Sequence, residues 1–369
     1  MADRFPPEIV IEILIRAEVQ TLLRCRSVSK KWLAIIDAPD FIKHQINHSI
    51  KTSTNKTLFV KEEYGRFYDY DFDCSDSCGT MEFRELPNSS RTRSVSLVGS
   101  CNGLICLRNE SNDDILIVNP STRKHHWFPG FLPLNFHSCV NLTWDGTWFR
   151  GSGYGFGYDR VSDDYKIVRI AQVHNTAKSW FLKSEMLICK VKTKIVRAVK
   201  IPFVVPTSHR MGVLANEALH WIAFRYDNPS SSEVILVYDL VTDEFREDPL
   251  PEFHESGMDI GLLGTWLCLT VNHEGVGVVV WVMKEYGVKE SWIKLFSISH
   301  TDLKYGSLRP LGFSKRWLEV LLELDGDRLV WYDIEKKKAE DILLHGSQMR
   351  YFEAIIFLRS LARVPADAN

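Results

Sequence analysis

The sequence has no apolar run long enough to cross a membrane. Its most apolar late stretch, residues 276–283, falls far short of the roughly twenty residues that a membrane helix requires. The first residues, with Asp3 and Arg4 before a Pro-Pro pair, lack the apolar core and small-residue cleavage site of a secretory signal. We therefore expect a cytoplasmic or nuclear protein whose eight cysteines are free thiols.

An excess of charge of either sign is missing as well. The formal net charge is -2, and basic and acidic residues are scattered along the chain. The longest purely basic run is the triplet at residues 336–338, whose polar setting is typical of a solvated turn. Since electrostatic attraction to phosphates needs a basic patch, we expect neither a nucleic acid nor a membrane surface as partner.

Motifs of catalysis and of metal or nucleotide binding are also absent. There is no Gly-x-Ser-x-Gly elbow. The pairs Cys74/Cys78 and Cys101/Cys106 lack the Cys-x2-Cys spacing of structural zinc sites. The glycine-rich run 151–157 is followed by a strand pattern, whereas a phosphate-binding loop needs a helix there. We therefore expect no catalytic residue, no metal and no cofactor, and a protein that is not an enzyme.

The first fifty residues do carry a clear pattern, and it is helical. Ile9 and Ile13 lie at helical spacing in a segment that we expect to start at the Pro6-Pro7 pair. Ser29 is placed to cap a later helix. The helices expected after the first cover residues 21–28, 30–36 and 40–46. So small a bundle cannot bury its large apolar side chains alone, so a partner or the following domain should cover part of them.

From about residue 57 the pattern changes to the alternation of β-strands. Residues 318–332 alternate on both sides of Asp325-Gly326, a turn signal, and so predict a β-hairpin. Asn102-Gly103 predicts a second hairpin in the same way. The region after the helices should therefore be all strand and turn.

A looser repeat runs through this β region, in which an apolar strand ends in a polar turn and an apolar or aromatic return follows. Clear units begin near residues 115, 237, 279 and 329, and weaker ones near 58 and 187. Their spacing of roughly 45 to 70 residues is at or above the period of about 50 of kelch-type propeller blades. We predict a mainly β protein: a kelch-like β-propeller of about six blades, preceded by a small three-helix module. The strand at residues 352–358 should complete the first blade.

The helical segment resembles an F-box, whose pattern runs Leu-Pro, a Glu-Ile-Leu helix, then Leu-x-Arg-x-Arg-x-Val-Ser/Cys-Lys-x-Trp. The matching residues are Pro6, Glu8, Ile9, Ile13, Leu14, Leu23, Arg24, Arg26, Val28, Ser29, Lys30 and Trp32. Phe5 replaces the usual Leu and keeps its apolar bulk, whereas residues 16–19 replace a Leu-Pro-x-Lys stretch and remove its proline. The resemblance implies binding of a Skp-type adaptor, through Phe5, Pro6, Ile9, Ile13, Leu14, Leu22, Leu23, Val28 and Trp32.

The β region resembles the plant F-box-associated interaction domain, in the class that contains S-locus and defence-regulating F-box proteins. The matching stretches are 100–105, 119–123, 157–159, 163–168, 218–221, 281–287 and 291–296. The resemblance implies a non-catalytic substrate receptor of a Skp–cullin–F-box ubiquitin ligase. Such a subunit would reach cullin and RING subunits through the adaptor and present a target protein for ubiquitination and proteasomal degradation.

The expected organisation is an F-box at residues 1–50, a substrate-recognition domain at 55–360 and a C-terminal tail at 361–369. Trp144 and Trp148 are candidates for target binding, because aromatic residues in polar loops on a rigid scaffold are typical of recognition surfaces. Two alternatives stay open. One is an F-box scaffold that acts without degradation, and the other is a propeller enzyme or ligand-binding protein with a site in its central funnel.

Overall fold

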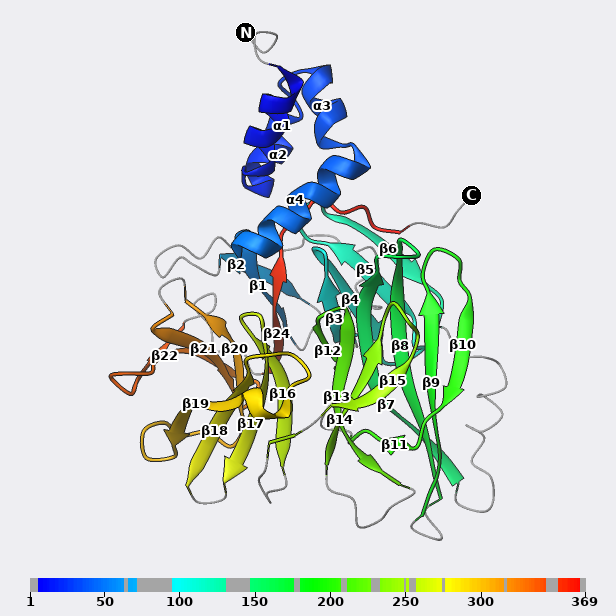
Figure 1. Cartoon of the computed structure of the whole chain (residues 1–369), viewed down its shortest axis with the longest axis vertical. Helices are drawn as coiled ribbons and strands as arrows, with labels where there is room; N and C mark the ends of the chain where they lie inside the picture. The colour runs from blue at the N-terminus through cyan, green and yellow to red at the C-terminus, as the bar shows by residue number, and fades with distance from the viewer. Residues whose placement is uncertain are drawn as a thin grey trace.

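The computed structural model describes residues 6–62, 66–71, 95–130, 147–175, 180–206, 211–226, 233–248, 250–251, 257–273, 276–314, 317–342 and 351–365. Helices come first along the chain, and strands make up most of the remainder (Figure 1). The helices stand at one end of the molecule, with α4 lying between the other three and the sheets (Figure 1). The chain is therefore mainly β with a small helical module in front, as predicted.

The described part of the helical module contains four α-helices, namely α1 (Pro7–Ile15), α2 (Val19–Cys25), α3 (Lys30–Ile36) and α4 (Pro39–Thr52). A proline opens α1 and another opens α4, where the missing N–H has no intrahelical partner to lose. Ser29 caps α3 as predicted, since its Oγ accepts a hydrogen bond from the Trp32 backbone N at 3.1 Å.

Two helices differ from the prediction in their bounds. Helix α2 begins at Val19, two residues earlier than expected, because Glu18 is already the extended residue that precedes a helix, and it ends at Cys25, three residues before the expected end at residue 28. Helix α4 does not end at residue 46 but continues to Thr52. Its second half is polar in sequence, yet Ser49 is buried and accepts a hydrogen bond from the Gln45 side chain at 3.2 Å. Ser53, in the left-handed conformation with φ 54°, then ends the helix.

Six antiparallel sheets follow. The strands of each sheet are given from the inner strand outward. The first sheet contains β24 (Phe352–Leu358), β1 (Lys56–Glu62) and β2 (Phe67–Asp71), and the second contains β3 (Val95–Cys101), β4 (Leu104–Asn109), β5 (Ile115–Asn119) and β6 (Lys124–Phe128). The third contains β7 (Thr147–Asp159), β8 (Asp164–Asn175), β9 (Trp180–Lys190) and β10 (Val196–Lys200).

The fourth, fifth and sixth sheets complete the set. The fourth sheet contains β12 (Val213–Ala215), β13 (Ala218–Arg225), β14 (Val234–Asp239) and β15 (Phe245–Asp248), with β11 (Phe203–Val204) also paired to β13. The fifth contains β16 (Met258–Leu263), β17 (Trp266–His273), β18 (Gly277–Met283) and β19 (Trp292–Ser299), with a short 3-10 helix at Lys289–Ser291. The sixth contains β20 (Leu308–Phe313), β21 (Glu319–Leu324), β22 (Arg328–Asp333) and β23 (Lys338–Asp341).

The six sheets close into a ring. The inner strands contact one another around the axis: β24 meets β3, β3 meets β7, β12 lies against β7 and β16, and β20 meets β16 and β24. The last strand, β24, pairs with β1, so that Phe59 lies opposite Ile355. The predicted six-bladed propeller is therefore confirmed, and so is the completion of the first blade by residues 352–358.

Both predicted hairpins are present. Asn102 and Gly103 join β3 to β4 with φ values of 52° and 84°, and a two-residue hairpin turn of this kind requires positive φ at both positions. Asp325 and Gly326 lie in the turn from β21 to β22 and also have positive φ, 57° and 71°. Local turn chemistry thus sets the register of both pairs.

A recurrent turn marks the ends of many strands. The last strand residue is Asn or Asp, and its side-chain oxygen accepts hydrogen bonds from backbone N–H groups two or three residues on. The capping residues are Asn109, Asn119, Asp159, Asp239 and Asp333. Four residues after each cap, a residue in the left-handed conformation leads into the next strand, namely Asp113, Arg123, Asp163, Asp243 and Lys337. This turn is the clearest repeated feature of the blades.

The glycine-rich run lies within strand β7, at the contact between the third and fourth sheets. A Cβ on Gly155 would lie 2.7 Å from Leu219 Cδ1 and 2.9 Å from the Trp221 ring, and one on Gly157 would collide with Leu240. These glycines therefore allow β7 to approach the next blade closely.

The connections between strands fall at two ends of the propeller. Because each complete blade runs from the inner strand outward in chain order, its first–second and third–fourth connections share one end. Residues 53–55 enter β1 at this same end, since Lys56 pairs with Leu358, the last residue of β24. The helical module therefore stands on the end that carries the turns after β3, β5, β7, β9 and β14.

Candidate partner-binding surfaces

The helical module exposes large apolar side chains. Ile9 and Ile13, one turn apart on α1, are 48% and 61% exposed, while Val28 before α3 and Leu33 on α3 are 58% and 40% exposed. Solvent-exposed branched aliphatic residues within so small a module are typical of a surface that a partner covers.

The residues predicted to bind the adaptor divide into three groups. Ile9, Ile13, Val28 and Pro6 are exposed, whereas Leu23 and Trp32 are half-buried against the module's core. Leu14 and Leu22 are buried, so they pack the helices together and offer no surface to a partner in this structure. Phe5 lies outside the described residues.

The core of the module is continuous with the propeller. Phe41, Ile42 and Ile46 of α4 share one apolar cluster with Leu104 and Tyr165, which belong to the second and third blades. This contact answers the expectation that the following domain covers part of the helices.

An ion pair reinforces the same contact. Lys43 Nζ of α4 lies 2.7 Å from Asp163 Oδ1, and Lys192 Nζ lies 2.9 Å from the other oxygen of that carboxylate. Hydrogen bonds from Lys192, Lys43 and Tyr158 lower the pKa of Asp163 well below its ordinary value. The carboxylate therefore stays ionised and links helix α4 to the turns after β7 and β9.

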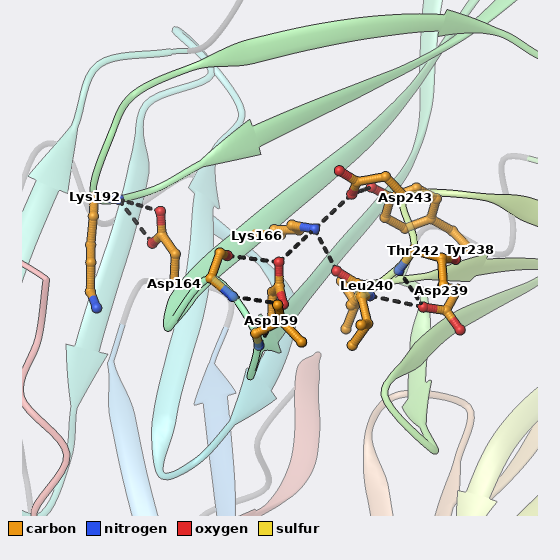
Figure 2. Close-up of polar contacts among 12 residues, drawn as sticks. Asp159, Asp164, Lys166, Lys192, Tyr238, Asp239, Leu240, Thr242 and Asp243 are labelled. Carbon is orange, nitrogen blue, oxygen red and sulfur yellow. Dashed lines mark hydrogen bonds and ion pairs between the residues drawn. The ribbon is translucent and has the colours of Figure 1, made fainter.

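A buried lysine joins the third and fourth blades (Figure 2). Lys166 on β8 is fully buried, and its Nζ lies 3.0 Å from Asp159 Oδ2 and 2.6 Å from Asp243 Oδ1. The same ammonium donates to the Leu240 carbonyl. Burial alone would raise the pKa of Asp159, but hydrogen bonds from Ser162 and Lys166 lower it to about 2. These contacts enclose the ammonium, so the cluster joins the third blade to the fourth.

Of the two tryptophans proposed for target binding, one is placed by the backbone. Trp148 lies on strand β7, paired with His174 of β8, and not in a loop as the polar sequence of residues 135–150 suggested. The loop position expected for Trp148 is therefore wrong, because backbone pairing with β8 holds residues 147–150 in a strand despite their polar sequence context. The role of Trp148 in target binding stays a prediction. Trp144 lies outside the described residues.

An aromatic cluster that the sequence pattern does not predict lies on the end that bears the helices. Trp317 is 53% exposed and has a positive φ of 59°, rare for a bulky side chain. Its ring centroid lies 4.8 Å from that of Phe313 and 5.8 Å from that of Trp266, and Lys284 Nζ lies 3.2 Å from the Trp266 centroid. Nothing in the sequence pattern brings these residues together, because they belong to two blades.

The described segments carry neither a metal-binding cluster nor a membrane-spanning helix. There, no group of three or more His, Cys, Asp or Glu side chains is arranged to hold a metal ion. No helix among these residues is long and apolar enough to span a membrane. Five cysteines fall in these segments, and all are free thiols: Cys25, Cys101, Cys106, Cys189 and Cys268.

Comparison with known proteins decides the family. Residues 3–44 match the F-box domain family, and residues 57–360 match the family described as F-box associated beta propeller domain. The chain belongs to the F-box proteins with an F-box associated β-propeller. The helical module is thus the F-box, and the resemblance inferred from the sequence is confirmed.

Relatives of this F-box protein occur in Arabidopsis thaliana. The chain is 33% identical to F-box protein CPR1 over 386 residues, covering 99% of this chain and 90% of that protein. It is 31% identical to an F-box/kelch-repeat protein of the same plant, covering 86% and 85% of the two chains. Among solved structures, TolB from Acinetobacter baumannii aligns with a TM-score of 0.48 at 12% identity, over 89% of this chain and 73% of that one.

Proposed function

We propose that this F-box protein is a substrate receptor of a Skp–cullin–F-box ubiquitin ligase. Its F-box would bind a Skp-type adaptor, and its propeller would hold a target protein for ubiquitination and degradation. The observation that carries the proposal is the exposure of Ile9 and Ile13 on a helix whose neighbouring residues Val10 and Leu14 are buried.

The proposed role requires binding and positioning only. A receptor that holds a target beside a ubiquitin-conjugating enzyme raises the effective concentration of the target's lysines, and the chemistry belongs to other subunits. The chain itself would therefore be non-catalytic, work without a cofactor, and act in the cytoplasm or nucleus. Cullin and RING subunits would be reached through the adaptor. Target contacts are proposed for the propeller, with Trp144 and Trp148 as candidates.

The double variant Ile9→Asp/Ile13→Asp in the full chain tests adaptor binding. In the proposed complex the adaptor would cover both isoleucines. The two carboxylates should therefore weaken binding to a Skp-type adaptor by 100-fold or more, on the order of 3 kcal/mol, because the charged groups would lose water without gaining a partner. Affinity measured by calorimetry or by pull-down with purified adaptor gives the result.

The matched control is Ile50→Asp, which alters an equally exposed isoleucine (55%) on α4, beyond the matched F-box residues. It should leave adaptor affinity unchanged. Equal loss in both variants, or none in the double variant, would contradict the assignment of α1 as the adaptor surface. Proximity labelling in the native tissue under proteasome inhibition would then identify proteins held by the propeller.

A further inference from the structure

Only a short covalent connection joins the F-box module to the propeller at its N-terminal side. Helix α4 ends at Thr52 and strand β1 begins at Lys56. Ser53 and Asn55 between them both have positive φ, 54° and 60°, so the chain turns sharply twice. Such a connection restrains distance and not rotation, so the orientation of the module depends on the packing of α4 against the blades and on any further bridge between the two parts.

The C-terminal segment supplies a second attachment at the same place. The Arg359 backbone N donates to the Asn55 carbonyl at 2.7 Å, and the Arg363 guanidinium donates to the Asp37 carbonyl, beyond α3, at 2.9 Å. Between these two contacts, Leu361 and Ala362 are buried in the apolar cluster that α4 shares with the blades. The first residues of the segment expected as a tail are therefore packed.

The propeller provides a fitted seat for this segment. The Asn119 side-chain amide donates to the Ser360 and Ala362 carbonyls at 3.1 and 2.8 Å, and Ser360 Oγ donates to the Asn102 carbonyl at 2.7 Å. A Cβ on Gly103 would lie 2.6 Å from Ser360 Cβ, so only glycine fits there.

We infer that residues 359–365 form a strap that fixes the F-box on the propeller in one orientation. Residues 53–55 join the module covalently, α4 packs on the blades, and the strap adds a bridge from this contact to the end of α3, so the module is held at more than one point. If the proposed function holds, on which this consequence rests, the strap sets the position of a bound target relative to the adaptor. Asn102, Gly103 and Asn119, which stand in motifs typical of the family, thereby acquire a positioning role.

A lysine cross-link reports the docked orientation directly. Lys43 of the F-box and Lys192 of the propeller both lie within 3 Å of the Asp163 carboxylate, so a short amine-reactive cross-linker joins them only when the module is docked. The yield of this cross-link is measured by mass spectrometry in the full chain, in a chain that ends at Ser360, and in Arg363→Ala. The control is Arg328→Ala, which removes an ion pair with Asp341 in the sixth blade.

We expect the yield of the Lys43–Lys192 cross-link to fall about threefold or more in the truncated chain, because the loss of these contacts allows the module to undock locally. The yield should fall by a smaller factor in Arg363→Ala, which loses fewer contacts. Arg328→Ala should match the full chain. Near-UV circular dichroism checks that the propeller stays folded, and if truncation unfolds it, Arg363→Ala alone decides. Undiminished yield in every folded strap variant would overturn the inference. Adaptor affinity should stay unchanged in all of these variants. Failure of the strap inference is therefore distinguishable from failure of the proposed function, which the Ile9→Asp/Ile13→Asp variant tests.

Discussion

At the scale of single residues, the buried ammonium of Lys166 is the most consequential group of the propeller. It lies between Asp159 of its own blade and Asp243 of the next, and Tyr238 also donates to Asp243. Taking the Lys166 ammonium and the Asp159 carboxylate out of water is costly, and their attraction to each other and to the partly exposed Asp243 offsets that cost only while all three are present. Removing one member of the cluster should therefore lower the free energy of unfolding by more than the intact cluster contributes to it.

Lys166→Ala should lower the free energy of unfolding by about 3–5 kcal/mol, because two aspartates are left without their counter-ion. Lys192→Ala is the matched control: this exposed lysine pairs with Asp163, and its loss should cost about 1 kcal/mol or less. Urea denaturation of both variants measures the difference. Equal midpoints would show that the buried cluster contributes nothing beyond an ordinary surface pair.

At the scale of elements, the recurrent Asn/Asp turn joins strand to strand. Its fifth residue is left-handed, a conformation that costs a non-glycine residue roughly 1–2 kcal/mol. In the turn from β22 to β23 this residue is Lys337, with φ 53°, and it is exposed. The turn therefore stores some strain that a residue without Cβ would release.

Lys337→Gly should leave the free energy of unfolding unchanged or raise it by up to about 1 kcal/mol, because relief of strain outweighs the added chain entropy. Lys338→Gly, one residue on and within β23, should instead lower it by about 0.5–1 kcal/mol. Thermal melting of the two variants gives the sign. A destabilised Lys337→Gly would mean that the turn is not strained.

Elements that depend on local chemistry were predictable from the sequence. Helix α3 followed from Ser29 as its cap, and the hairpins followed from Asn102-Gly103 and Asp325-Gly326. Elements fixed by distant contacts were not. The second half of α4 is polar in sequence, and Ser49 is buried there by tertiary packing. Likewise, the packing of Leu361 was invisible, because its seat, Asn119, lies more than 200 residues earlier in the chain.

At the scale of the whole molecule, a buried histidine couples stability to pH. His220 lies in the fourth blade, with Nδ1 3.0 Å from the Val213 carbonyl and Nε2 2.7 Å from the Tyr286 hydroxyl beside the fifth blade. Burial lowers the pKa of His220 to about 4, although the contact with the Val213 carbonyl opposes this shift. The folded protein therefore keeps this imidazole neutral.

Stability should fall in two steps on acidification. Between pH 6.5 and about 4, His220 binds a proton in the unfolded chain but not in the folded protein. The free energy of unfolding therefore decreases as pH falls. Between pH 3.8 and about 2 the favourable ionisation of Asp159 is lost in the same direction. Urea midpoints measured from pH 8 to pH 2 reveal both steps. His220→Gln should remove the first step and keep the second, and an unchanged upper step in this variant would assign it to another group.

The pairing of β1 with β24 also has a consequence for synthesis. The F-box leaves the ribosome before the propeller and contains its own helices, but the ring has no complete first blade until residues 352–358 emerge. During most of translation the nascent propeller carries an unpaired strand edge at β1, the kind of surface that chaperones protect. Under the proposed function, a prematurely terminated chain would thus keep the helices that bind the adaptor while its ring stays open, and would compete for adaptor without delivering a target.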